Sequence, residues 1–217
     1  IVPANHAWEP AERSYDRLQP EPLATVPEAS IAAAAEALTN GKRTAIVVGG
    51  GALREGPLTL AGRIAAGCNA TLLCETFPVR VERGAGRVPF ARIPYFAEQA
   101  IEFLKDVEQM ILVGTQQPVA FFAYPGVASL LAPPDCMMLT LADVHDDIGA
   151  ALEALARRVD APADCPRQPR IAPTLVDGEL TPGAIGDVIS ARLPDNAIVS
   201  DEGITCGLEL FLRTQGA

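Results

Sequence analysis

The feature that most constrains the fold is an alternation of short, continuous apolar runs with longer segments of helical periodicity. The run Thr44–Val48 is largely β-branched and leads into glycine, and the runs 71–74, 109–114 and 137–141 have the same apolar character. Such runs are typical of strands covered on both faces, and strands that alternate with helices form parallel sheets. The sequence predicts an α/β domain with a mostly parallel sheet of about six strands and helices on both faces.

Helix signals lie between and beside these runs. Asn40-Gly41 gives the first helical segment a C-terminal stop, and Thr181 is a candidate N-cap before a proline in the last full one. Asp146 or Asp147 can cap a further helix. Helices are expected near residues 28–38, 58–66, 96–105, 147–159 and 181–193, followed by a strand at 197–200 and a helix from Cys206.

Composition narrows the class of protein. The chain has 217 residues, is 49% hydrophobic, and carries a formal net charge of -10. An acidic chain lacks the basic face that nucleic acids require, and no apolar run approaches the roughly 20 residues of a membrane helix. The start also lacks the layout of a signal peptide. We therefore expect a cytoplasmic protein that binds neither nucleic acid nor membrane.

The cysteines and histidines indicate no metal site. Five cysteines form no C-x-x-C pair, and the chain has only two histidines, His6 and His145. An odd number of unclustered cysteines is typical of free thiols in a reducing compartment. A zinc site would need more ligands than these residues supply.

Two proline-rich segments divide the chain. They occupy residues 8–27 and 160–177, and neither has a convincing period. Ile1–Asn5 has the pattern of a strand tail, and the last residues suggest a further domain that is cut off. We predict an excised central domain with these boundaries: 1–27 as the tail of a preceding domain and linker, 28–160 as the central domain, 161–180 as a linker, and 181–217 as the start of a following domain.

Gly49-Gly50-Gly51 lies where a dinucleotide-binding turn would lie, between a strand and a helix. Gly49 and Gly51 fit a G-x-G-x-x-G pattern, but the third glycine position is Arg54. A tight turn without a ligand explains the same residues.

A loop near residues 76–93 is rich in arginine and glycine. Its arginines could hold phosphate groups, but an interface with a neighbouring domain or subunit is the preferred interpretation. The residues are Arg80, Arg83, Arg87 and Arg92.

Two other clusters follow strands. Capping and surface exposure explain Asp143, His145, Asp146 and Asp147 better than acid–base catalysis does. The segment 116–126 concentrates aromatic residues, and we interpret it as an apolar contact with another domain.

Asp201 to Thr205 lies just after the strand expected at 197–200 and just before a helix. Backbone N–H groups and a hydroxyl at such a turn can hold a phosphate. A plain capped turn is the alternative.

Taken in order, these pieces resemble the thiamine diphosphate-dependent enzymes of the acetolactate synthase and benzoylformate decarboxylase type, over essentially the whole chain. The strands within 43–52 and 109–114 are similar to those of the family's middle domain, which is Rossmann-like, of the DHS-like NAD/FAD-binding type. Ile1–Asn5 with Trp8 resembles the end of the pyrimidine-binding domain. Residues 196–208 resemble the start of the diphosphate-binding domain.

The resemblance implies a parent enzyme that acts beside the carbonyl of a 2-keto acid, with thiamine diphosphate and magnesium, as a dimer or tetramer. The family's catalytic glutamate and its G-D-G…N motif belong to other domains, so no catalytic or metal-binding residue is assigned here and the chain alone is expected to be inactive. The resemblance places cofactor contacts only at Glu202, Gly203, Ile204 and Thr205, Thr205 foremost.

Some middle domains of this family bind FAD or ADP, and others are empty. FAD-binding members carry an arginine-and-aspartate pattern where this chain has Thr115–Val119, so the resemblance does not favour FAD. The alternative to a structural domain is a free-standing nucleotide-binding module that uses Gly49–Gly51 and the loop 80–92.

Overall fold

The protein folds around a five-stranded parallel sheet. The computed structural model describes residues 3–10, 13–14, 16–175, 177–203 and 206–217. The sheet order is β3-β2-β1-β4-β5, and every neighbouring pair is parallel. The strands are β1 Thr44–Val48, β2 Thr71–Cys74, β3 Ala91–Arg92, β4 Gln109–Val113 and β5 Met137–Ala142. The α/β class and the parallel sheet are confirmed, with five strands in place of about six.

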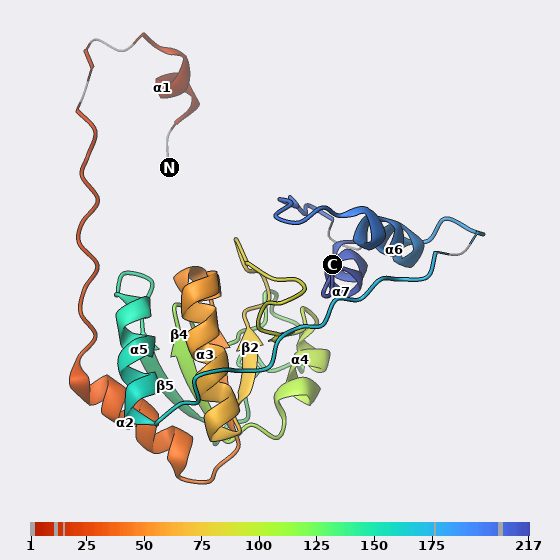
Figure 1. Ribbon diagram of the computed structural model, residues 1–217. Coiled ribbons are helices and arrows are strands. Elements are labelled where there is room, and N and C mark those ends of the chain that lie inside the picture. Colours follow the sequence, from red (N-terminus) through yellow and green to blue (C-terminus); the bar gives the residue numbers. More distant parts are fainter. Residues whose placement is uncertain (1–2, 11–12, 15, 176, 204–205) are drawn as a thin grey trace.

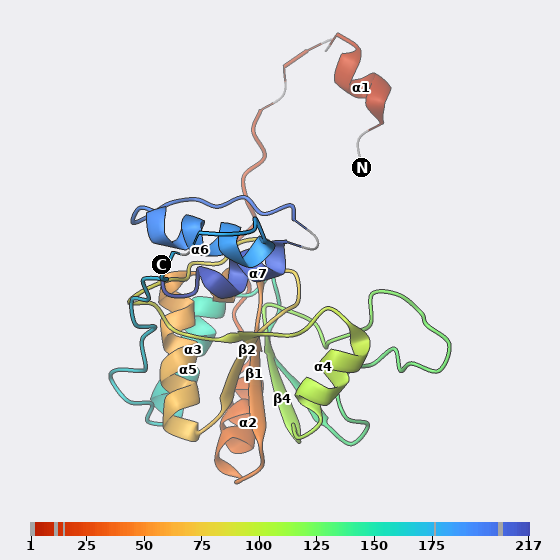
Figure 2. The same ribbon diagram turned by 90° about the vertical axis from the view of Figure 1, so that its right-hand side faces the viewer.

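Helices cover both faces of the sheet, as Figure 2 shows. Helices α2, α3 and α5 pack on one face and α4 on the other. Their bounds are α2 Glu28–Thr39, α3 Glu55–Cys68, α4 Ala97–Leu104 and α5 Ile148–Arg158, and a short 3-10 helix, η1, runs from Gly50 to Leu53. The Asp147 carboxylate accepts a hydrogen bond from Ala150 N, which confirms one of the two predicted caps of α5.

The pattern of β1 explains why both faces are covered. Side chains of a strand alternate between the faces of a sheet. Ile46 and Val48 belong to the core beneath α2, α3 and α5, whereas Ala45 and Val47 belong to the core beneath α4. All five residues of β1 are buried, so a continuous apolar run is what this position requires.

One buried polar side chain anchors α2 to the sheet. Gln109 in β4 is fully buried, and its amide nitrogen donates to Ala37 O at 2.9 Å and to Thr44 Oγ1 at 2.8 Å. Its carbonyl oxygen accepts from Asn40 Nδ2 at 2.8 Å. Because a buried amide is stable only when it is hydrogen-bonded, this network fixes the end of α2 over the strands.

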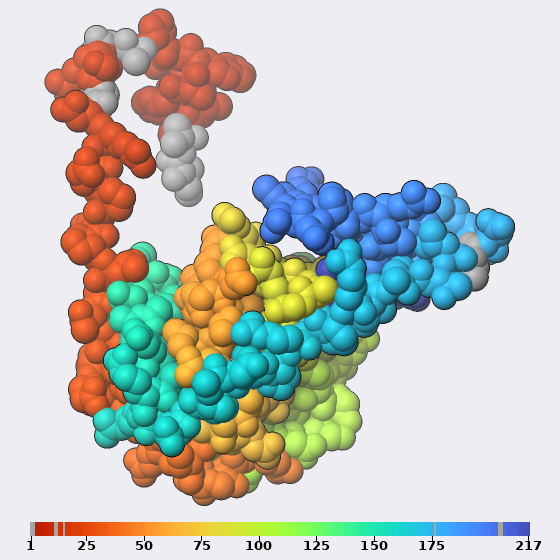
Figure 3. All heavy atoms as spheres, in the orientation of Figure 1, coloured from red at the N-terminus to blue at the C-terminus, as the bar shows by residue number. Residues whose placement is uncertain are grey.

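The N-terminal segment differs from the expectation. Ile1 and Val2 lie outside the described residues. Ala4–Trp8 form a short helix, α1, so the predicted strand tail is wrong for Ala4 and Asn5. The described residues between Glu9 and Leu23 form no helix or strand, and Ala24 bridges to Asp146. Figures 1 and 3 show this segment standing away from the sheet and its helices.

The C-terminal segment contains α6 Pro182–Arg192 and α7 Gly207–Arg213. Thr181 caps α6 by accepting from Ala184 N, as predicted. The strand expected at 197–200 is wrong: these residues form no strand, and Ile198 is 96% exposed. A strand needs a neighbour to pair its backbone groups, and no described strand lies beside this segment. Among the described residues, no helix combines the length and apolar character needed to cross a membrane.

Candidate functional site

The crevice between the carboxyl ends of β1 and β4 is the place where an open α/β sheet usually binds a ligand. The chain leaves β1 toward one side of the sheet and later returns to the other, which makes this the topological switch point. Gly49 N donates to Val113 O at 3.0 Å, so the two strand ends lie close together. A Cβ on Gly49 would lie 2.7 Å from Thr115 Cβ, so only glycine fits at this position.

A carboxylate occupies this crevice. Glu75 directly follows β2, and its Oε2 accepts from Thr115 Oγ1 at 3.0 Å. Its Oε1 accepts from Gly50 N at 3.4 Å, a long hydrogen bond. Glu75 thus takes a backbone donor that a phosphate would need and places negative charge beside it.

The start of the following helix is also occupied. Gly50–Leu53 form the 3-10 helix, so α3 begins only at Glu55 rather than directly after the glycines. Glu55 N donates to the Glu82 carboxylate at 2.6 Å. A dinucleotide-binding fold holds phosphate with the glycine turn and the helix N-terminus. In this chain, acidic side chains accept hydrogen bonds from both.

The arginine loop makes contacts inside the molecule. Arg80 pairs with Glu82 at 3.8 Å, and Arg87 Nη1 lies 2.6 Å from Glu55 Oε2, an ion pair without hydrogen-bond geometry. Arg83 and Arg92 contact Phe211 of α7. Arg83 and Arg92 thus face the C-terminal segment, which supports the interface interpretation, and an interface with a separate domain or subunit stays a prediction.

The aspartate cluster after β5 organises the chain locally. Asp146 Oδ2 accepts from Asp143 N at 2.7 Å, and Asp147 caps α5. His145 contributes its backbone oxygen, which accepts from Ala24 N at 3.0 Å. No group of three or more acidic, histidine or cysteine side chains among the described residues could hold a metal ion. The geometry supports capping rather than catalysis at this cluster.

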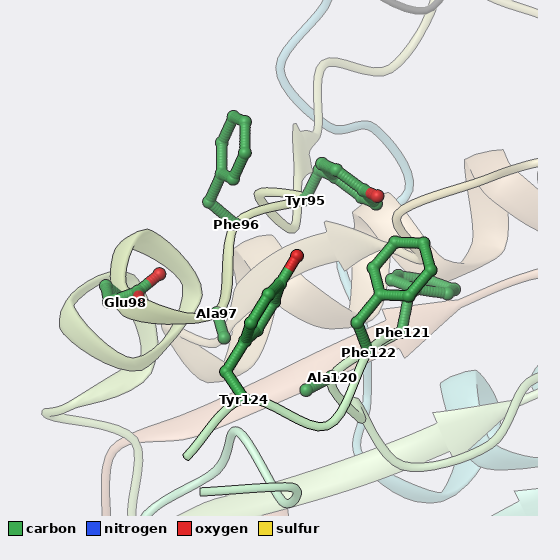
Figure 4. Close-up of a pocket in the computed structure, with 8 residues that line it drawn as sticks. All are labelled: Tyr95, Phe96, Ala97, Glu98, Ala120, Phe121, Phe122 and Tyr124. Atoms are coloured by element: carbon green, nitrogen blue, oxygen red, sulfur yellow. The ribbon is translucent and has the colours of Figure 1, made fainter. Parts of the chain in front are cut away.

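The aromatic segment lines a hollow of about 130 Å³ with residues from the start of α4. Figure 4 shows Phe122 and Tyr124 of this segment opposite Tyr95 and Phe96. The Phe121 and Tyr95 rings stack with their centroids 5.7 Å apart. Phe121, Phe122 and Tyr124 are each about half exposed. Exposed apolar patches of this kind mark contact or binding sites, and the contact with another domain stays a prediction.

The turn predicted to reach a cofactor diphosphate is described only in part, because Ile204 and Thr205 lie outside the described residues. Gly203 N donates to Asp201 Oδ1 at 2.8 Å, and Glu202 is exposed. This N–H is thus already paired, and two carboxylates lie at the turn. The described part does not by itself form a diphosphate site.

Burial suppresses the ionisation of one cysteine beside the crevice. Cys74 is fully buried at the end of β2, and this burial raises its pKa to about 12, against the smaller opposing effect of Arg92. None of the five cysteines forms a disulfide. A thiol that stays protonated at neutral pH is a packing residue rather than a nucleophile.

Sequence reasoning missed three residues of these sites: Glu75, Glu82 and Phe211. Glu75 carried a usable signal, because the first residue after β2 must lie at the same sheet edge as the glycines after β1 and β4. Glu82 and Phe211 act through contacts between distant segments, which no local pattern predicts.

Comparisons with known proteins place these features in context. No protein-family model matches the chain. A Mycobacterium tuberculosis protein described as "Putative acetolactate synthase large subunit IlvX" is 39% identical over 220 residues, which cover 100% of this chain and 42% of that protein. The chain therefore spans less than half the length of this relative.

Solved structures give the same result at the level of fold. A "putative thiamin diphosphate-dependent enzyme" from Mycobacterium smegmatis matches with a TM-score of 0.67 and 21% identity, over 95% of this chain and 43% of that one. The thiamine diphosphate-dependent 4-hydroxybenzoylformate decarboxylase of Rhodococcus jostii RHA1 matches with a TM-score of 0.65 and 18% identity, over 92% of this chain and 40% of that one. Sequence similarity thus relates the whole chain to one part of an acetolactate synthase large subunit-like protein, and its fold is that of one part of two solved thiamine diphosphate-dependent enzymes.

Proposed function

We propose that the chain is the central part of a thiamine diphosphate-dependent decarboxylase or carboligase of the acetolactate synthase type, in which it is a structural domain. The observation that carries this proposal is the 39% identity to an acetolactate synthase large subunit-like protein along the whole chain. The domain boundaries at 27, 160 and 180 are part of the proposal. So are the 2-keto acid substrate, the dimeric or tetrameric assembly and the cytoplasmic location of the whole protein.

The cofactor chemistry is assigned to the whole protein. In the whole protein, bound thiamine diphosphate with magnesium would supply a carbanion nucleophile for chemistry at the carbonyl of a 2-keto acid. This sequence contains no G-D-G motif for that metal. We therefore assign this chain the spacing and orientation of the cofactor-binding domains, with Glu202, Gly203, Ile204 and Thr205 as its candidate cofactor contacts.

The geometry of the crevice supports a domain that holds no nucleotide. Glu75 and Glu82 pair with the backbone donors that a diphosphate would need. A diphosphate could bind here only by displacing the two carboxylates from these donors. Binding would then lose the hydrogen bonds of the carboxylates and bring the negative phosphates close to them, and both effects oppose it. This argument counts against FAD or ADP in the central domain and against the alternative of a free-standing nucleotide-binding module.

Isothermal titration of the 217-residue chain with FAD, ADP and thiamine diphosphate with magnesium tests the structural role. We expect no binding of FAD or ADP. Micromolar affinity for either, equivalent to about -8 kcal/mol, would overturn the structural assignment. The whole protein that contains this chain should release carbon dioxide from a 2-keto acid or join two such acids only when thiamine diphosphate and magnesium are present. Turnover that does not depend on the cofactor would overturn the enzyme assignment.

A further inference from the structure

The C-terminal segment returns to the arginine loop and packs against it. Ala85 N donates to Ala217 O at 3.0 Å, and Ile171 N donates to Gly216 O at 2.8 Å. Figure 2 shows α6 and α7 lying over the sheet edge where this loop runs. The contacts of the loop itself, Ala85 with Ala217 and Arg83 with Phe211, join residues that are more than 120 positions apart.

Two arginines, which we call the arginine clamp, hold one aromatic ring of α7. The guanidinium carbons of Arg83 and Arg92 lie 4.1 and 4.5 Å from the centroid of the Phe211 ring. Phe211 is only 8% exposed. Cation–π contacts strengthen when they are shielded from water, so this ring is the main anchor of α7 on the loop.

Arg83 also makes hydrogen bonds to α7 and to the residue that follows it. Its Nη1 donates to Phe211 O at 3.0 Å, and its Nη2 donates to Thr214 Oγ1 at 2.6 Å. The Thr214 hydroxyl in turn donates to Leu210 O at 2.7 Å. The Arg83 guanidinium thus donates to the Phe211 carbonyl, one of the carbonyls that lack a partner within the helix at the C-terminal end of α7.

This arrangement has an electrostatic cost. Burial, and to a smaller extent the nearby charge of Arg92, lower the pKa of Arg83 to about 10. The Asp201 carboxylate acts in the opposite direction on the same guanidinium. Through Asp201, the residues before α7 thus favour the charged state of Arg83.

Those residues form one tight unit with α7. Gly207 N, at the start of the helix, donates to Gly203 O at 2.7 Å. A Cβ on Gly207 would lie 2.6 Å from the Asp201 carboxylate oxygens, so only glycine allows this approach. A movement of α7 would therefore move Asp201 and Gly203 with it.

We propose that Arg83 and Arg92 are positioning residues that fix α7, and with it the turn Asp201–Gly203, against the central sheet. One consequence rests on the proposed function. In the whole protein, the clamp sets the position of the turn that we assign to the cofactor diphosphate. Arg83 and Arg92 act through Phe211 and α7, and they touch no cofactor themselves.

Hydrogen exchange in the 217-residue chain tests the clamp. We expect Arg83→Met to accelerate exchange in 207–213 while β1 and β4 stay protected. Arg80→Met is the matched control, because Arg80 lies in the same loop and its side chain is 67% exposed. Phe211→Leu should reproduce the effect by removing the ring, and Arg83→Lys should restore protection only in part, since an ammonium cannot donate as a fork to two acceptors. Unchanged exchange in Arg83→Met would overturn the clamp.

Cofactor affinity in the whole protein tests positioning. We expect Arg83→Met to raise the Kd of thiamine diphosphate with magnesium about tenfold, the effect of about 1.4 kcal/mol, with kcat restored at saturating cofactor. Arg80→Met should leave the Kd unchanged. Faster exchange with an unchanged Kd would refute the positioning role. If the wild-type whole protein binds no thiamine diphosphate, the proposed function fails, and the exchange experiment still decides the clamp.

Discussion

The Thr115 hydroxyl donates a 3.0 Å hydrogen bond to the Glu75 carboxylate and so joins the ends of β4 and β2 across the end of β1. This contact closes the crevice at which Rossmann-like sheets usually hold a ligand. The residues that close it come from two strand ends 40 positions apart in the chain. A carboxylate of the chain itself thus lies beside the glycine turn at this crevice.

Replacing Glu75 and Thr115 singly and together should measure how much their hydrogen bond contributes to stability. We expect Glu75→Ala and Thr115→Ala each to lower the free energy of unfolding, and the double variant to lose about 1 kcal/mol less than the sum, because the bond can be lost only once. Urea unfolding of the four proteins measures the cycle. Additive losses would show that the bond contributes nothing to stability.

Gly114 should tolerate no side chain. Its φ is +65°, and a Cβ would lie 2.7 Å from Gly49 O, so we expect Gly114→Ala to cost about 3 kcal/mol through strain and overlap together. Gly126 is the matched control, with a φ of +78° and nothing within 4 Å of a Cβ. Gly126→Ala should cost only about 1 kcal/mol. Equal losses for the two variants in urea unfolding would contradict the close approach at the crevice.

Gln109→Leu should destabilise the protein despite leaving an apolar side chain in the core. The substitution removes the partner of Ala37 O, Asn40 and Thr44, and we expect a loss of about 2 kcal/mol. Gln117→Leu, at an exposed position, provides the comparison and should change stability by less than about 0.5 kcal/mol. A Gln109→Leu protein as stable as the wild type would mean that the network does not hold α2.

Stability should fall between pH 9 and pH 12 because of Cys74. An unfolded thiol ionises near the ordinary value of 9.0, whereas burial raises the folded pKa to about 12. In this window the folded state holds the proton that the unfolded state releases, so the stabilisation present below pH 9 is lost as pH rises. From pH 8 to pH 10 the contribution of this thiol should fall by about 1.4 kcal/mol.

Urea unfolding at the two pH values measures this loss. Cys74→Ala should show a correspondingly smaller change between pH 8 and pH 10, whatever its stability at pH 8. The same pH dependence in both proteins would assign the loss to other groups. Cys74 should also resist alkylation at pH 8 in the folded protein, because its thiol is buried and protonated.

Local patterns determined most of the fold. Continuous apolar runs predicted four of the five strands. Strands β1 and β4 are buried at every position, as a strand covered on both faces requires, whereas β5 is partly exposed. Asp147 and Thr181 correctly predicted where two helices begin, because their side-chain oxygens cap the helix N-termini. The order of these pieces also supported the family resemblance that the comparisons bear out.

The sites depended on contacts between distant residues. The glycine turn by itself suits either a phosphate or a turn without ligand, whereas the carboxylate beside it comes from Glu75 at the next strand end. The run 197–200 has a strand's composition, but it lacks a partner among the described strands and stays unpaired. Thus the sequence by itself determined which segments can be helices and strands, because that depends on neighbours along the chain. The tertiary structure decided which polar groups meet at the crevice and the clamp, because hydrogen bonds and cation–π contacts act only over a few ångströms in space.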